Sequence, residues 1–193
     1  MSAPKPPAWL GFTTTSLGGL LGVLKNQCAI SQAFDPVIGG TPQPAGIQPV
    51  QFDAIWDTGA TNSCITQAVI DACGLLPIGM AQVTGVGGTT EEEVFLVNVY
   101  LPNHVAFSGL RVTRGKFVGA DILIGMDIIS NGDFAVTNYQ GVTKFSFRVP
   151  SQRHIDYVQE HEQAKLRAEF HHGGKKNRPK RPSKTSGKNK RRK

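Results

Sequence analysis

The chain has 193 residues, of which 39% are hydrophobic and 18% are charged, and its formal net charge is +7. No apolar run approaches the roughly 20 residues that a membrane-spanning helix needs, so this length suits one folded domain with flanking segments and no membrane contact. The charge is uneven, because residues 173–193 hold eleven Lys or Arg and no acid, which leaves ten basic against fourteen acidic residues in positions 1–172. We therefore expect a mildly acidic, cytoplasmic domain that carries a basic tail.

The first part of the chain predicts three strands. Residues 1–10 are rich in Pro and are expected to be disordered. Residues 12–34 contain recurring Thr, Leu, Val and Ile with glycine and polar breaks, which favours two strands over a helix. The apolar stretch 17–24 is short and broken by glycine, so it makes a poor signal-peptide core. Four Pro and three Gly in residues 35–49 predict a loop, and residues 50–56 then alternate and turn apolar, as a strand entering a core does.

A short helix is predicted next, followed by a hairpin. Thr66 is a suitable N-cap for a helix over residues 67–73, and Gly74 suits the left-handed residue that ends it. Residues 91–101 and 105–112 have the composition of two strands, with Pro, Asn and His near the turn between them.

The remaining folded elements are short. Residues 122–124 predict a buried strand, and Asp127 suits the cap of a helical turn that follows it. Residues 134–137 and 142–149 alternate and predict closing strands. Residues 155–170 place a few apolar side chains among charges, which predicts a weakly amphipathic helix.

Many short strands with one or two small helices indicate an all-β, barrel-like domain. The divisions that we expect are a disordered Pro-rich start over 1–10, the β domain over 11–150, a helix within 151–172, and a disordered basic tail over 173–193.

The cysteines and histidines do not indicate a metal or a cofactor. Cys28, Cys64 and Cys73 are an odd number without metal-ligand spacing, so we expect buried free thiols rather than a disulfide or a nucleophile. His154 and His161 lie seven residues apart with no carboxylate or thiol at ligand spacing, and they are expected to be solvated.

Two short signatures carry the chemistry. Asp57-Thr58-Gly59-Ala60 follows apolar residues at the end of a predicted buried strand and occurs once in the chain. Burying an isolated carboxylate at the end of such a strand costs free energy, which suggests a functional role for Asp57. The alternative is an ordinary β-turn, which Asp-Thr-Gly also suits. The second signature is the apolar strand that ends at Gly125, 68 residues after Asp57.

Together these signatures resemble the retropepsin family of aspartic proteases over roughly residues 15–150. The resemblance implies an acid-protease barrel that works as a homodimer, in which the Asp57 carboxylates of two chains share one proton around a water. It also implies that the Thr58 hydroxyl bonds across the dimer axis, that the Gly59 N–H helps to orient the carboxylate, and that Ala60 packs beneath the site. Met126 stands where many retroviral members have a basic residue, as in cellular relatives.

The resemblance further implies a glycine-tipped flap that covers the substrate. Residues 84–89 lie at the right distance beyond Asp57, and Gly85, Val86, Gly87 and Gly88 would form the tip that contacts the substrate. A plain surface hairpin is the alternative, because the three glutamates at 91–93 are not typical of viral flaps and suit a solvent-exposed strand.

The function implied is an aspartic endopeptidase, free of cofactors, that hydrolyses peptides or unfolded proteins. One alternative is a catalytically weak module that keeps the fold for binding, with the basic tail contacting nucleic acid or acidic partners. Another is a protease that acts chiefly on its own precursor or on a polyprotein. The tail by itself suits a solubilising role as well as non-specific contact with phosphates.

Overall fold

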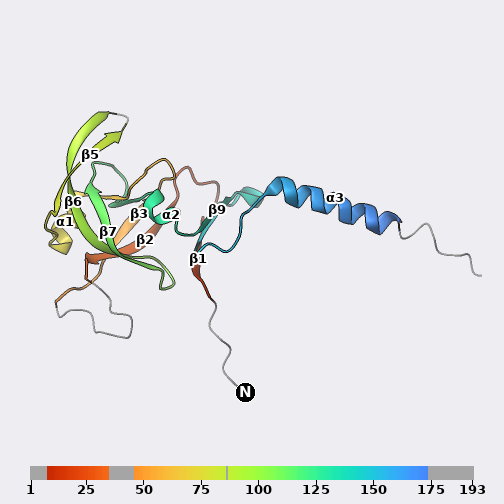
Figure 1. Cartoon of the computed structure of the whole chain (residues 1–193), viewed down its shortest axis with the longest axis horizontal. Helices are drawn as coiled ribbons and strands as arrows, with labels where there is room; N and C mark the ends of the chain where they lie inside the picture. The colour runs from red at the N-terminus through yellow and green to blue at the C-terminus, as the bar shows by residue number, and fades with distance from the viewer. Residues whose placement is uncertain (1–7, 35–45, 86, 174–193) are drawn as a thin grey trace, which may run out of the picture. The chain divides into compact units, whose positions relative to one another are not determined.

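The computed structural model describes residues 8–34, 46–85 and 87–173 (Figure 1). The expectations about the Pro-rich start, most of the 35–49 loop, Val86 and the basic tail lie outside these residues. The chain divides into two compact units, one ending at Arg153 and one beginning at His154, and each is described by itself.

Within its described residues, the first unit has strands as its main secondary structure, with a few short helices. In chain order its elements are β1 (Leu10–Thr15), β2 (Lys25–Gln32), β3 (Val50–Trp56), β4 (Cys64–Ile65), α1 (Gln67–Cys73), β5 (Gly79–Gly85), β6 (Gly88–Tyr100), β7 (Ala106–Arg114), β8 (Ile122–Ile124), α2 (Met126–Ile129), β9 (Asp133–Thr137), η1 (Tyr139–Gly141) and β10 (Lys144–Val149). The predicted all-β fold with short helices is confirmed. Residue 10, assigned above to the disordered start, is instead the first residue of β1 and pairs with Val149.

Seven strands form one sheet in the order β2-β3-β8-β4-β7-β6-β5. Because β2 also pairs with β6, through Ala29 opposite Tyr100, the sheet closes on itself, which removes most free edges. Side chains from these strands fill the barrel, and the largest fully buried ones include Ile30, Phe95, Val97, Ile122 and Ile124. The predicted barrel is therefore present, with β5 continuing as an extra strand.

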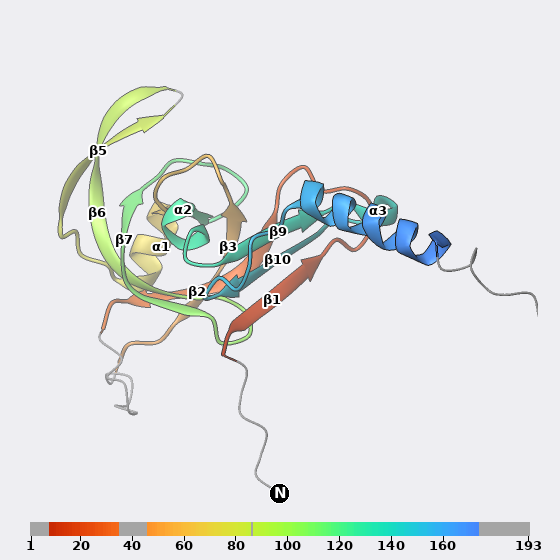
Figure 2. The ribbon, with the colours of Figure 1, turned by 45° about the vertical axis from the view of Figure 1, so that its right-hand side comes forward.

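A second, three-stranded antiparallel sheet has the order β1-β10-β9 (Figure 2). Trp56, the last residue of β3, lies between the two sheets and stacks on Phe134 with ring centroids 5.2 Å apart. It also packs at 5.2 Å against Phe147 of β10. Such aromatic pairs add about 0.5–1.5 kcal/mol each to the area they bury. The residue that precedes Asp57 is thus fixed by packing.

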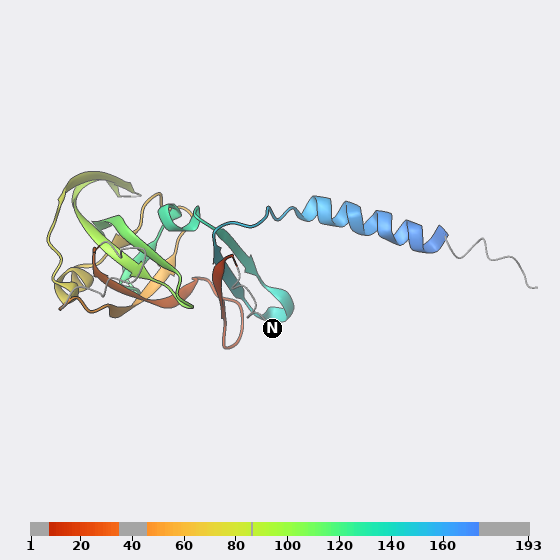
Figure 3. The ribbon, with the colours of Figure 1, turned by 60° about the horizontal axis from the view of Figure 1, so that its bottom comes forward.

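The second unit contains one helix, α3 (Tyr157–Gly173), which is drawn in blue in Figure 3. Asp156 caps it, since its Oδ1 accepts hydrogen bonds from the N–H groups of Val158 and Gln159. The helix begins two residues later than expected, and it includes Gly173, which was assigned to the tail. Val158 and Leu166, expected on its apolar face, are 70% and 55% exposed, so that face is not buried. No helix in the described ranges is long and apolar enough to cross a membrane.

Candidate active site

Asp57 lies where two parallel strands end together. In β3, Trp56 is opposite Ile124 of β8, and the Asp57 N–H donates to the Ile124 carbonyl at 3.0 Å. The chain then turns back, and the Ala60 N–H donates to the Asp57 carbonyl at 3.3 Å. We call residues 57–62 the Asp57 loop.

The Asp57 carboxylate is held from within its own turn. The Gly59 N–H donates to Asp57 Oδ1 at 2.8 Å. A Cβ at Gly59 would lie 3.1 Å from that same oxygen, so glycine leaves room for the hydrogen bond. Asp57, Thr58 and Gly59 are all exposed in the single chain, contrary to the burial that the preceding strand suggested. The other carboxylate oxygen of Asp57 accepts no hydrogen bond from the described residues and is available to a water, a substrate or a second carboxylate.

Ser63 and Asp127 brace the far end of the Asp57 loop. Ser63 is buried, and its N–H and Oγ–H donate to the two Asp127 carboxylate oxygens at 2.8 and 2.7 Å. Ser63 Oγ also accepts from the Gly125 N–H at 3.0 Å. Asp127 Oδ1 also accepts from the Ile128 N–H at 2.9 Å. The prediction that Asp127 caps this helical turn is wrong, because Asp127 lies within α2 and the N-cap position belongs to Gly125, where no side chain makes a capping bond. The hydrogen bonds to Ser63 were not predicted, because nothing local in the sequence links positions so far apart.

Gly125 lets the second signature approach the Asp57 loop. The Met126 N–H donates to the Ala60 carbonyl at 2.8 Å, and the Asp127 N–H donates to the Thr61 carbonyl at 3.1 Å. A Cβ at Gly125 would lie 2.7 Å from the carbonyl carbon of Asn62 and 3.0 Å from the carbonyl oxygen of Ala60. Only glycine fits there without moving the backbone. The two signatures found in the sequence are therefore joined directly, main chain to main chain.

The glycine-rich segment forms the predicted hairpin between β5 and β6 (Figure 1). In its register Thr84 is opposite Thr89 and Gly85 is opposite Gly88. The two threonine hydroxyls are 2.9 Å apart, and Gly88 adopts a φ of +108°, which glycine tolerates. Gly85, Gly87 and Gly88 are exposed, and Val86 lies outside the described residues.

Glu92 and Glu93, expected only to keep this hairpin soluble, form ion pairs with Arg114 of β7 at 3.4 and 2.9 Å. Since β6 pairs with β7 only from Val94 onward, Arg114 holds the hairpin at the point where it leaves the barrel.

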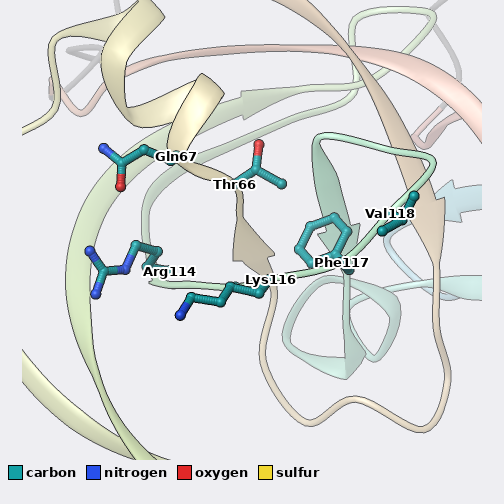
Figure 4. Close-up of a pocket in the computed structure, with 7 residues that line it drawn as sticks. Thr66, Gln67, Arg114, Lys116, Phe117 and Val118 are labelled. Atoms are coloured by element: carbon teal, nitrogen blue, oxygen red, sulfur yellow. The ribbon is translucent and has the colours of Figure 1, made fainter.

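A pocket of about 530 Å³ lies between the start of α1 and the chain that leaves β7 (Figure 4). It is lined by Thr66, Gln67, Arg114, Gly115, Lys116, Phe117 and Val118. None of the predicted site residues lines it. Thr66 is the N-cap of α1, as predicted, but its hydroxyl does not cap the helix and has no hydrogen-bond partner among the described residues.

The three cysteines are free thiols, as expected, but only Cys28 is fully buried. Burial, followed by the nearby carboxylates of Asp127 and Asp57, raises the pKa of Cys64 to about 11. Burial also raises the pKa of Cys28 to about 12 and that of Cys73 to about 11. These thiols stay protonated near neutral pH, which makes them poor nucleophiles.

No protein-family model and no curated protein sequence matches the chain. The structure is similar to a retropepsin-like aspartic protease from Rickettsia conorii, at 11% identity and a TM-score of 0.42, over 74% of this chain and 98% of that one. It is similar to the Simian Foamy Virus (mac) protease, at 20% identity and a TM-score of 0.32, over 42% of this chain and 81% of that one. It is also similar to a retroviral protease-like domain from Leishmania major, at 19% identity and a TM-score of 0.38, over 60% of this chain and 82% of that one.

Proposed function

We propose that the protein is an aspartic endopeptidase whose active site forms when two copies of the chain place their Asp57 carboxylates face to face. The observation that carries this proposal is the state of Asp57 in one chain. One carboxylate oxygen is held by the Gly59 N–H, the loop is fixed to α2, and the residue is exposed. The signature occurs once, so a second carboxylate has to come from a second copy.

Two carboxylates a few ångström apart cannot both ionise, so together they hold one proton. The ionised Asp57 takes a proton from a water as that water attacks the carbonyl carbon of the peptide bond. The protonated Asp57 gives its proton to the carbonyl oxygen, which leaves a tetrahedral intermediate with two hydroxyl groups. The Asp57 that took the proton from water then gives it to the amide nitrogen as the C–N bond breaks, and one hydroxyl of the intermediate returns its proton to the other Asp57, so the amine and the carboxylic acid leave and the pair again holds one proton. The titration of such a site belongs to the pair.

The neighbouring residues have supporting roles in this proposal. Thr58 is exposed beside Asp57, and its hydroxyl would bond to the other copy across the two-fold axis. Ala60, whose carbonyl is held by α2, would lie beneath the pair. The hairpin ending at Gly85, Gly87 and Gly88 would close over an extended peptide, whose main chain can bond as an added strand.

The test compares cleavage of an unstructured protein by the wild type and by Asp57→Asn from acidic to neutral pH. We expect Asp57→Asn to lose at least about 100-fold in kcat, because a neutral amide cannot act as the base. Asp71→Asn is the matched control, since Asp71 is an exposed carboxylate on α1. A statine-containing peptide, which mimics the tetrahedral intermediate, should inhibit the wild type. Equal cleavage by wild type and Asp57→Asn would exclude Asp57 from the reaction.

A further inference from the structure

The loop between β1 and β2 exposes an unusual amount of apolar surface. Residues 16–24, which we call the apolar loop, contain no charged residue. Its side chains Leu17, Leu20, Leu21 and Val23 are 110%, 65%, 39% and 52% exposed. Contiguous exposed apolar side chains on a soluble domain mark an interaction surface more often than scattered ones do.

The apolar loop is held firmly although its side chains point outward. The Ser16 N–H donates to the Thr143 carbonyl at 2.9 Å, and the Leu21 N–H donates to Thr143 Oγ1 at 3.0 Å. Ser16 Oγ in turn accepts from the Thr143 N–H and donates to the Gly19 carbonyl. Thr143 is buried at the start of the β10 region. The leucines are therefore exposed on a loop whose backbone is fixed by hydrogen bonds.

The end of the apolar loop lies beside the candidate active site. The Leu24 carbonyl accepts a hydrogen bond from the Trp56 N–H at 3.0 Å, and Trp56 directly precedes Asp57. The loop can be followed in Figure 2 as the red segment that joins β1 to β2. A two-fold axis that brings two Asp57 carboxylates together has to pass close to each of them, and therefore also close to the Leu24 end of this loop.

We propose that the apolar loop is the surface through which a second copy of this chain docks beside Asp57. The inference rests on the proposed function, because that function requires the two-fold axis. Residues that lie close to a two-fold axis meet their own copies, so charged side chains there would repel each other. A loop without charge avoids this repulsion, and its leucines leave water when the two copies meet.

The test is the concentration dependence of the sedimentation coefficient for the full chain. Leu17→Ser combined with Leu20→Ser should raise the dimer dissociation constant at least about 100-fold, because each dimer loses four apolar side chains from its contact. Leu76→Ser combined with Ile78→Ser is the matched control, since these residues are 81% and 52% exposed outside the loop. The control pair should sediment like the wild type, and both variants should keep the wild-type unfolding midpoint because all four side chains are exposed.

Cleavage assays on the same samples separate this inference from the proposed function. If the loop variant is monomeric and inactive when dilute, but regains activity when concentrated, both the docking surface and the protease proposal are supported. If the wild type dimerises through the loop and cleaves nothing, the docking surface stands and the protease proposal fails. A loop variant that associates as tightly as the wild type overturns the docking surface. In that case a raised KM of the loop variant would show that the loop binds the substrate. Loss of binding to vesicles of anionic phospholipid by the loop variant would show that the loop contacts a membrane.

Discussion

The Ser63 hydroxyl donates a 2.7 Å hydrogen bond to the Asp127 carboxylate, and this joins the loop that carries Asp57 to α2. The Ser63 N–H makes a second bond, to the other carboxylate oxygen. A charged acceptor bound twice at such distances is among the stronger hydrogen-bonded arrangements in proteins. Asp127 therefore acts on the candidate site through Ser63, as a positioning residue.

Replacing Asp127 by Ala should destabilise the fold and lower activity together. The buried Ser63 N–H and hydroxyl would lose their acceptors, which costs about 1–3 kcal/mol for each group left unsatisfied. Urea unfolding measures the stability, and the cleavage assay gives kcat and KM. Asp71→Ala, which removes an exposed carboxylate on α1, should leave both within error of the wild type. If Asp127→Ala is as stable as the wild type, the hydrogen bonds between Ser63 and Asp127 do not contribute to the stability of the fold.

Gly125→Ala should be more damaging than its size suggests. The added Cβ would lie 2.7 Å from the carbonyl carbon of Asn62, and because that neighbour is backbone it cannot swing away. We expect a loss of about 1–3 kcal/mol in unfolding free energy, with lower kcat as the Asp57 loop shifts. Gly79→Ala is the control, because a Cβ there meets nothing within 4 Å. Equal unfolding midpoints for the two variants would contradict the close packing inferred at Gly125.

The stability of the first unit should depend on Asp133 at neutral pH more than in acid. Hydrogen bonds from the Ser151 hydroxyl and the Gln152 N–H, together with Arg148, hold the pKa of Asp133 well below its ordinary value. A lowered pKa in the folded state stabilises the protein above the unfolded-state pKa of about 3.9, and this contribution is lost as the pH falls further toward the folded-state value.

Asp133→Asn should therefore be less stable than the wild type near neutral pH, and the difference should shrink as the pH is lowered below about 4. Urea midpoints measured along that pH range check this. A difference that stays constant with pH would mean that the charge of Asp133 is not what stabilises the fold.

The basic tail should govern any contact with polyanions. We expect the full chain to bind a nucleic acid of arbitrary sequence with an affinity that falls steeply as salt rises, because its Lys and Arg displace counterions from phosphates. A chain that stops at Gly173 lacks all eleven of these charges and should bind at least about tenfold more weakly at low salt. Fluorescence anisotropy of a labelled nucleic acid at several salt concentrations measures the affinity of each chain and its dependence on salt. Equal binding by the two chains would leave the tail with a solubilising role.

The elements with strong local signals could be predicted from the sequence to the residue. β3 and α1 have the bounds expected for residues 50–56 and 67–73, and Gly74 has the predicted left-handed φ of 59°. Alternation, cap residues and glycine act within a few positions, so one sequence shows them. The N-cap chemistry was wrong in detail, because the Thr66 hydroxyl makes no capping bond.

The contacts between distant positions could not be predicted in the same way. Ser63 and Asp127 are 64 residues apart, and nothing in the sequence around either residue indicates that their side chains meet. The bonds from Thr143 to the apolar loop, and the closure of β2 on β6, likewise depend on how the sheets fold together. The two signatures of the candidate site could be recognised because each is a short run of consecutive residues. The hydrogen bonds between Ser63 and Asp127 depend on the tertiary fold and could not be predicted.

The central claim is that catalysis needs an Asp57 from each of two chains, and mixing wild type with Asp57→Asn at constant total concentration tests it most directly. If the copies exchange and both carboxylates are required, activity follows the square of the wild-type fraction, so an equal mixture keeps about one quarter of the wild-type rate. A rate that falls in direct proportion to the wild-type fraction, keeping about one half at equal mixing, would contradict the shared site.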